Sequence, residues 1–129
     1  MSQESHPGEY HDAMVAYLEW IWGRDFMAPG GEGNVDRLVK GLDLSGRQVL
    51  DIGCGIGGPA FVLARKHGAL VTGIDLEPQL VARATRRAAE LGLSGRAEFR
   101  TVTLGPLEFP DGSFDVVFTS GALTQTEDK

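Results

Sequence analysis

An acidic residue followed by a glycine-rich turn is the part of this sequence with the most specific chemistry. Residues 49–58 read Val-Leu-Asp-Ile-Gly-Cys-Gly-Ile-Gly-Gly, so an apolar run passes through Asp51 into a turn with four glycines. Pro59 follows and suits the first turn of a helix, where the N–H that proline lacks would have had no partner. A strand, a glycine turn and a helix N-terminus in this order are typical of a site for a nucleotide-like cofactor.

Asp75 adds a second carboxylate to the same predicted site. It ends the next apolar run, 18 residues after Gly57, where an acidic residue accepts hydrogen bonds from the ribose of a nucleoside cofactor. The charge of Asp51 then decides between two candidate cofactors, NAD and S-adenosylmethionine. It would oppose the anionic pyrophosphate of NAD, whereas S-adenosylmethionine has no phosphate and carries an ammonium group and a sulfonium. An NAD-dependent oxidoreductase stays the alternative.

Alternating strands and helices must hold these residues in place. Helical spacing of apolar residues runs over 10–22 and again after Asn34, a good N-cap, whereas the glycine-rich segment 23–33 is expected to lack regular structure. Because parallel βαβ units cross over right-handedly, we predict an α/β fold with a Rossmann-like doubly wound parallel sheet in the strand order 3-2-1-4. The predicted strands are 48–52, 70–75, 97–102 and 114–119, and the helices between them are 60–67 and 78–91.

The fourth predicted strand would lie at an edge of the sheet. Its centre, Val116-Val117-Phe118, has no charged residue, and such an edge exposes backbone groups that invite pairing. We therefore expect an incomplete sheet, in a fragment of a longer protein or in a homodimer that covers this strand. The expected division is a flexible tail over 1–9, N-terminal helices and a lid loop over 10–45, and an α/β core over 46–129 that stops before the last strands.

Composition excludes several classes of function. The 12 basic and 18 acidic residues give a net charge of −6, which disfavours nucleic-acid binding. Cys54 is the single cysteine and the three histidines lack metal-ligand spacing, so neither an intramolecular disulfide nor a metal site is expected. No apolar run approaches the ~20 residues of a membrane span. We predict a cytoplasmic protein without membrane or nucleic-acid partners.

The motifs resemble class I S-adenosylmethionine-dependent methyltransferases over residues 10–129. Asp51-x-Gly53-x-Gly55-x-Gly57 is similar to motif I of that family, and Asp75 to the acidic residue that follows it. The chain is similar in particular to the phosphoethanolamine and sarcosine/dimethylglycine N-methyltransferase branch. The blocks that carry this likeness are 20–23, 26–31, 51–58, 73–76 and 109–115.

The resemblance implies roles for the matching residues. Asp75 would hold the ribose of S-adenosylmethionine and Leu76 would pack on the adenine, while the residues of the turn would line the methionine end. Tyr10 would be catalytic, because it matches a tyrosine that orients and deprotonates the acceptor amine. The cofactor contacts expected in all are Met27, Ala28, Asp51, Gly53, Gly55, Gly57, Asp75, Leu76, Thr103, Leu104 and Ser120.

Some positions differ from this branch. Thr103 replaces an aspartate that binds the adenine amino group, Ser120-Gly121 replaces an Arg-Asp pair, and Gln125 replaces a histidine. The acid–base partner of Tyr10 is therefore absent. Methyl transfer asks mainly for proximity and alignment, and a base is needed only when the acceptor is protonated or weakly acidic. These differences favour another acceptor, or a chain that binds the cofactor without turnover.

The sequence thus predicts an enzyme that transfers a methyl group from S-adenosylmethionine, with S-adenosylhomocysteine as product, to a small acceptor, most simply an amine. Trp20 and Trp22 are expected to pack in the core or the lid, and Cys54 to fill space in the turn. A second interpretation of Asp51 is that it accepts hydrogen bonds from backbone N–H groups of the turn.

Overall fold

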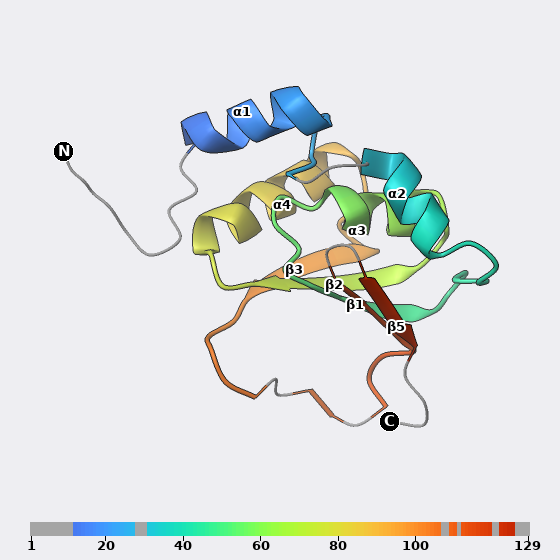
Figure 1. Cartoon of the computed structure of the whole chain (residues 1–129). Coiled ribbons are helices and arrows are strands. Elements are labelled where there is room, and N and C mark those ends of the chain that lie inside the picture. The colour runs from blue at the N-terminus through green and yellow to red at the C-terminus, as the bar shows by residue number, and fades with distance from the viewer. Residues whose placement is uncertain (1–11, 28–30, 107–108, 111, 120–121, 126–129) are drawn as a thin grey trace.

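The computed structural model describes residues 12–27, 31–106, 109–110, 112–119 and 122–125. Strands and helices alternate along most of this chain (Figure 1). In chain order they are α1 (Asp12–Trp22), α2 (Gly31–Leu38), β1 (Gln48–Ile52), α3 (Gly58–Arg65), β2 (Leu70–Asp75), α4 (Pro78–Glu90), β3 (Ala97–Thr101), β4 (Val116–Thr119) and β5 (Ala122–Gln125).

One sheet with the strand order β3-β2-β1-β4-β5 forms the centre of the fold. The first four strands in this order run parallel, which confirms the predicted α/β fold and the order 3-2-1-4. Asp51 of β1 pairs with Gly73 of β2 and with Phe118 of β4, and Asp75 pairs with Thr101 of β3. Strands β1, β2 and β3 therefore end side by side, and the residues after them share one edge of the sheet.

The fourth strand is not an edge, and this prediction is wrong. Strand β5 pairs with β4 in the antiparallel sense, from Val116 opposite Gln125 to Thr119 opposite Ala122. The backbone of β4 is thus hydrogen-bonded on one side to β1 and on the other to β5. The homodimer expected through an exposed fourth strand loses its premise, because the same chain supplies the neighbouring strand.

The described helices all lie on one face of the sheet, with α3 and α4 directly on the strands and α1 and α2 outside them (Figure 1). Helix α3 is buried from Ala60 to Ala64, because α2 covers it from outside and the sheet from inside. Phe61 of α3 contacts Phe99 of β3 edge-on, with ring centroids 5.7 Å apart. This layer fixes the start of α3, where the glycine turn ends.

Helix α2 begins at Gly31, three residues before the predicted N-cap Asn34. The low helix propensity of glycine is offset by tertiary contacts. Glu32 and Asp36 lie 3.2 and 2.5 Å from Nζ of Lys66 at the end of α3. A hydrogen bond from Lys66, followed by one with His67, holds the pKa of the Asp36 carboxyl below its usual value. Val35 of α2 is buried in the same core as α3, so distant contacts that local sequence patterns do not report hold this helix in place.

Helix α1 touches the rest of the molecule along a narrow face. Val15 is fully buried and packs with Ile56 of the glycine turn and Leu80 of α4. The prediction that Trp20 packs in the core or lid is wrong, since this side chain is 82% exposed and stacks on Tyr17; the side chain of Trp22 lies outside the described part. None of the described helices has the length and apolar character needed to cross a membrane.

Close packing between β2 and its neighbours gives a prediction for stability. A Cβ atom on Gly73 would lie 2.6 Å from the Phe99 ring and 2.8 Å from Cβ of Cys54. We expect Gly73→Ala to lower the free energy of unfolding by about 1–3 kcal/mol, the usual cost of overpacking a core. Gly95→Ala is the matched control, because a Cβ there would have no atom within 4 Å. Denaturant unfolding measures both, and equal effects would contradict the packing argument.

Candidate functional site

The glycine turn is fastened to the neighbouring strand. The backbone N–H groups of Gly53 and Cys54 both donate to the carbonyl oxygen of Ile74, at 2.8 and 2.9 Å. The N–H of Gly57 donates back to the carbonyl of Cys54 at 3.0 Å. These bonds curl the chain at the end of β1 and lead it into α3, so the turn is held beside the end of β2.

The glycines of the turn meet different demands. Gly57 has a φ of +100°, and a Cβ there would lie 2.6 Å from the Phe61 ring. A Cβ on Gly58 would lie 2.3 Å from the carbonyl oxygen of Asp25. At Gly53, by contrast, a Cβ would meet no atom within 4 Å. The later glycines are therefore needed for packing within the protein, whereas Gly53 borders open space that a ligand can enter.

Asp75 organises the backbone on both sides of the site. Its Oδ2 accepts a hydrogen bond from the N–H of Gly55 at 2.9 Å, and its Oδ1 accepts one from the N–H of Glu77 at 3.0 Å. The first bond holds the glycine turn and the second shapes the entry to α4. This turn-binding role was predicted as a second interpretation of Asp51, and Asp75 performs it.

Asp51 is a polar residue buried in the core, at 2% exposed, and within the described part of the chain its Oδ2 has no hydrogen-bond partner. Burial, with a smaller contribution from the nearby charge of Asp75, raises the pKa of the Asp51 carboxyl to about 8. A buried carboxylate without partners is costly. Groups with such perturbed pKa values concentrate at functional sites, and a cationic ligand would relieve this cost.

A cavity of about 70 Å³ opens at the turn. Asp51, Gly53 and Gly55 line it together with Met27, whose sulfur would lie 3.3 Å from a Cβ on Gly55. Pockets that enclose a whole small molecule usually measure about 300–1,000 Å³. This cavity therefore suits the end of a ligand that continues along the edge of the sheet.

The remaining predicted residues either follow β2 and β3 or lie outside the described part of the chain. Leu76 follows β2, and Thr103 and Leu104 follow β3; all three are exposed, with Leu76 and Leu104 at 47% and 86%. The N–H of Val102 donates to the carbonyl of Asp75 at 2.9 Å, which keeps the exit of β3 beside the site. Tyr10, Ala28 and Ser120 lie outside the described residues, as does the side chain of Gln125.

Cys54 fills space in the turn, as its sequence position indicates. It is buried, and burial, followed by the charges of Asp51 and Asp75, raises the pKa of its thiol well above the usual range. It is thus poorly suited to act as a nucleophile. Within the part of the chain that the structure describes, no cluster of three or more His, Cys, Asp or Glu could hold a metal ion.

Sequence reasoning missed several residues at this site. Ile56, Pro59 and Phe118 line the cavity, and so do Asp25 and Phe26 from the loop after α1. Asp25 is held by Arg87 of α4, 62 residues away in sequence. The positive φ of Asp25, 73°, cannot be predicted from a local sequence pattern. The sequence predicted only that the glycine-rich segment 23–33 forms a lid loop.

The comparisons with known proteins agree with this geometry. Residues 49–129 match the family described as the methyltransferase domain. The chain belongs to this family. The resemblance to class I S-adenosylmethionine-dependent methyltransferases is thereby confirmed, and the alternative of an NAD-dependent oxidoreductase is not favoured.

The chain is similar to individual methyltransferases with different names. Phosphoethanolamine N-methyltransferase 1 of Arabidopsis thaliana is 34% identical over 122 residues, 94% of this chain and 24% of the relative. The 2-methyl-6-phytyl-1,4-hydroquinone methyltransferase of Synechocystis sp. is 40% identical over 126 residues, 96% of this chain and 37% of the relative.

A solved structure shares the fold as well as the sequence. Phosphoethanolamine N-methyltransferase 2 of Haemonchus contortus, in complex with phosphomonomethylethanolamine and S-adenosylhomocysteine, matches with a TM-score of 0.80 and 34% identity. The match covers 88% of this chain and 27% of that protein. The chain therefore spans about a quarter of the length of the phosphoethanolamine N-methyltransferases that it resembles.

The burial of Asp51 predicts how stability depends on pH. Its pKa is about 8 in the folded chain, against an ordinary value of 3.8. Between these values the folded chain holds a proton that the unfolded chain has released. The free energy of unfolding should therefore fall as the pH rises from about 4 to about 8, by up to about 1.4 kcal/mol per pH unit.

Asp51→Asn removes this titration. We expect its unfolding free energy to depend less on pH and to exceed that of the parent chain at about pH 9, where the parent holds a buried charge. Denaturant unfolding over this pH range measures the effect, with Asp43→Asn, at an exposed site, as the control. Parallel profiles for the parent and Asp51→Asn would show that Asp51 titrates normally.

Proposed function

We propose that this chain is the cofactor-binding part of an S-adenosylmethionine-dependent methyltransferase that acts on a small-molecule acceptor, an amine in the first instance. The observation that carries the proposal is the buried Asp51, which lines a cavity at the glycine turn and whose Oδ2 has no hydrogen-bond partner among the described residues. Among nucleoside cofactors, S-adenosylmethionine offers cations to this place, whereas a dinucleotide offers phosphate charge. When bound, it supplies a methyl group on a sulfonium.

The charge of Asp51 provides a reason for selectivity. At pH 7 the raised pKa keeps the carboxyl protonated in the free chain. An ammonium group beside Oδ2 would lower this pKa, because a nearby opposite charge favours the ionised form. Binding and proton release would then occur together. Phosphate in the same place would have the opposite effect on the carboxyl.

Asp75 is proposed to bind the ribose. Each of its carboxylate oxygens accepts one backbone N–H, and each has a further lone pair for a hydroxyl group. Leu76, Thr103 and Leu104 follow β2 and β3 on the same edge, where an adenine could rest. Met27 walls the methionine end, and Ala28, Ser120 and Tyr10 keep the roles that the resemblance implies.

An amine acceptor is supported by the relatives named phosphoethanolamine N-methyltransferase. A relative named for a hydroquinone is similar to the same part of the chain, so this part is compatible with several acceptors. Ser120, Gly121 and Gln125 replace the residues that serve the amine in the phosphoethanolamine branch. We therefore propose an amine that binds without this acid–base pair.

Three further expectations stay predictions. A cytoplasmic location is supported by a single, buried cysteine rather than a disulfide framework. The net charge of −6 supports a partner other than nucleic acid. A homodimer would now have to form through β5 or another surface, since β4 is paired within the chain.

Calorimetry tests the cofactor. We expect S-adenosylhomocysteine to bind the chain and NADH not to bind, and S-adenosylmethionine to release a proton at pH 7, seen as a binding enthalpy that changes with the buffer. Asp51→Asn should abolish the proton release.

Asp75→Ala should weaken binding by about 1–3 kcal/mol, because paired polar groups lose their acceptor, whereas the exposed Asp43→Asn should bind as the parent does. Binding of NADH alone would refute the proposal.

A methyl-transfer assay tests the acceptor. Labelled S-adenosylmethionine is offered with primary, secondary and tertiary amines, each with and without a phosphate group. Transfer to an amine without phosphate would support the proposed acceptor. Transfer that requires phosphate would contradict it, and binding of cofactor without transfer to any of these amines would contradict an amine acceptor.

A further inference from the structure

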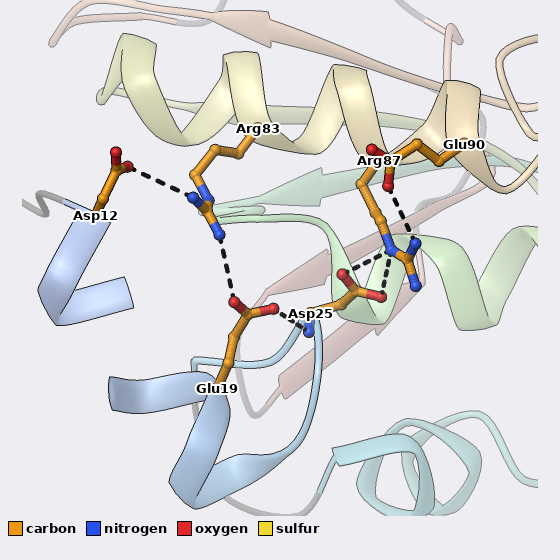
Figure 2. A network of polar contacts seen from close by, with 6 residues as sticks. All are labelled: Asp12, Glu19, Asp25, Arg83, Arg87 and Glu90. Carbon is orange, nitrogen blue, oxygen red and sulfur yellow. Dashed lines mark hydrogen bonds and ion pairs between the residues drawn. The ribbon is translucent and has the colours of Figure 1, made fainter. Parts of the chain in front are cut away.

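A network of ion pairs ties the N-terminal segment to helix α4 (Figure 2). Nε of Arg87 lies 3.1 Å from both carboxylate oxygens of Asp25, and Arg83 reaches Glu19 of α1 at 3.3 Å. Oε2 of Glu19 in turn accepts a hydrogen bond from the N–H of Asp25 at 2.7 Å. The two arginines of α4 thus hold the end of α1 and the loop that follows it.

Asp25 is the residue that needs this support. Its φ is +73°, a left-handed conformation that is unfavourable for residues other than glycine unless surrounding contacts hold it. Its N–H and its carboxylate make hydrogen bonds, and its carbonyl oxygen lies close against Gly58 at the start of α3. The loop therefore keeps its shape through contacts from other elements rather than by its own preference.

The loop that Asp25 shapes forms one wall of the cavity at the turn. Asp25, Phe26 and Met27 line this cavity opposite Asp51 and Gly53. Phe26 is fixed by a hydrogen bond from its N–H to the carbonyl of Gly23 at 3.0 Å. Arg87 itself does not line the cavity, so any influence on a ligand there passes through Asp25.

We propose that Arg87 is a positioning residue for the cofactor, which it serves by holding residues 24–27 against the glycine turn through its ion pair with Asp25. The inference rests on the proposed function, because it assumes that the cavity receives the methionine end of S-adenosylmethionine. Arg87 raises the fraction of molecules in which the wall is in place, and apparent affinity is proportional to that fraction.

Arg87 matters more than Arg83 in this arrangement. The side chains of Arg87 and Asp25 are 23% and 16% exposed, so solvent screens this pair less than most surface pairs. The Arg83–Glu19 pair is similarly shielded, at 29% and 20%, but it reaches Asp25 only through the Glu19 carboxylate. Arg87 contacts Asp25 directly, and a partly shielded charge pair with hydrogen bonds contributes more than an exposed one.

Binding of S-adenosylhomocysteine by four variants tests this role. Arg87→Gln should raise the dissociation constant about tenfold, corresponding to about 1.4 kcal/mol, and Arg87→Lys should recover part of the loss. Asp25→Asn, which tolerates a positive φ but lacks the charge, should match Arg87→Gln. The double variant should be no weaker than either single one, because both remove the same interaction.

Arg86→Gln is the matched control, since Arg86 is the adjacent and exposed residue of α4. It should bind as the parent does. Added salt should weaken binding by the parent more than by Arg87→Gln, because salt screens the ion pair that the variant lacks. Unchanged affinity in Arg87→Gln, or an equal loss in Arg86→Gln, would overturn the proposal.

Amide hydrogen exchange of the ligand-free chain separates this inference from the proposed function. In the absence of ligand, Arg87→Gln should speed exchange at the N–H of Phe26 at least several-fold relative to Arg86→Gln. If the parent does not bind S-adenosylhomocysteine, the proposed function is wrong, and the cofactor role of Arg87 falls with it. If the parent binds while exchange at Phe26 is the same in both variants, only the positioning role is wrong.

Discussion

Close approach of backbone to backbone at the start of α3 is the constraint on which the site depends. The carbonyl of Asp25 lies where a Cβ on Gly58 would be, and the Phe61 ring lies where a Cβ on Gly57 would be. Side chains at these two glycines would push the lid loop and the core ring away from the turn. Because neither glycine has a side chain, one short turn contacts the core, the lid loop and the edge of the sheet. The cavity beside Asp51 exists as a consequence of this packing.

Asp51 shows what the arrangement costs. A carboxyl whose Oδ2 has no partner in the core is destabilising, and the fold accepts it at the end of β1, where Val or Ile would pack better. Stability sacrificed at one position is typical of sites that bind or react. Asp75, only a strand away, has both oxygens engaged by backbone N–H groups. The two carboxylates therefore differ in kind: Asp75 already orders the backbone around the site, whereas Oδ2 of Asp51 has no hydrogen-bond partner among the described residues.

The sequence was sufficient for features that depend on short-range patterns. The bounds of β1 and β2 were predicted correctly from apolar runs that end at Ile52 and Asp75, and the right-handed crossover rule then gave the order of four strands. Features that depend on distant contacts were missed. Helix α2, which starts at Gly31, is held against α3 by the buried Val35 and by ion pairs to Lys66. Strand β5 pairs with β4, and Trp20 is exposed because α1 touches the body along one narrow face. The pairing of Asp25 with Arg87 spans 62 residues and has no local signal.

Charge is used in two opposite ways around one cavity, and the difference explains why both kinds of residue are needed. Arg87 and Asp25 neutralise each other at the rim, so their pair can hold a strained loop without attracting a ligand. Asp51 lies inside, and its Oδ2 has no hydrogen-bond partner among the described residues, so it can ionise beside a cation but cannot hold the loop in place. Without the Arg87–Asp25 pair, the cavity would lose the loop that forms one of its walls. Without the buried carboxyl of Asp51, it would have no group that favours a cation. Affinity in such a site is the product of a populated shape and a complementary charge, and these two contributions come from different elements of the fold.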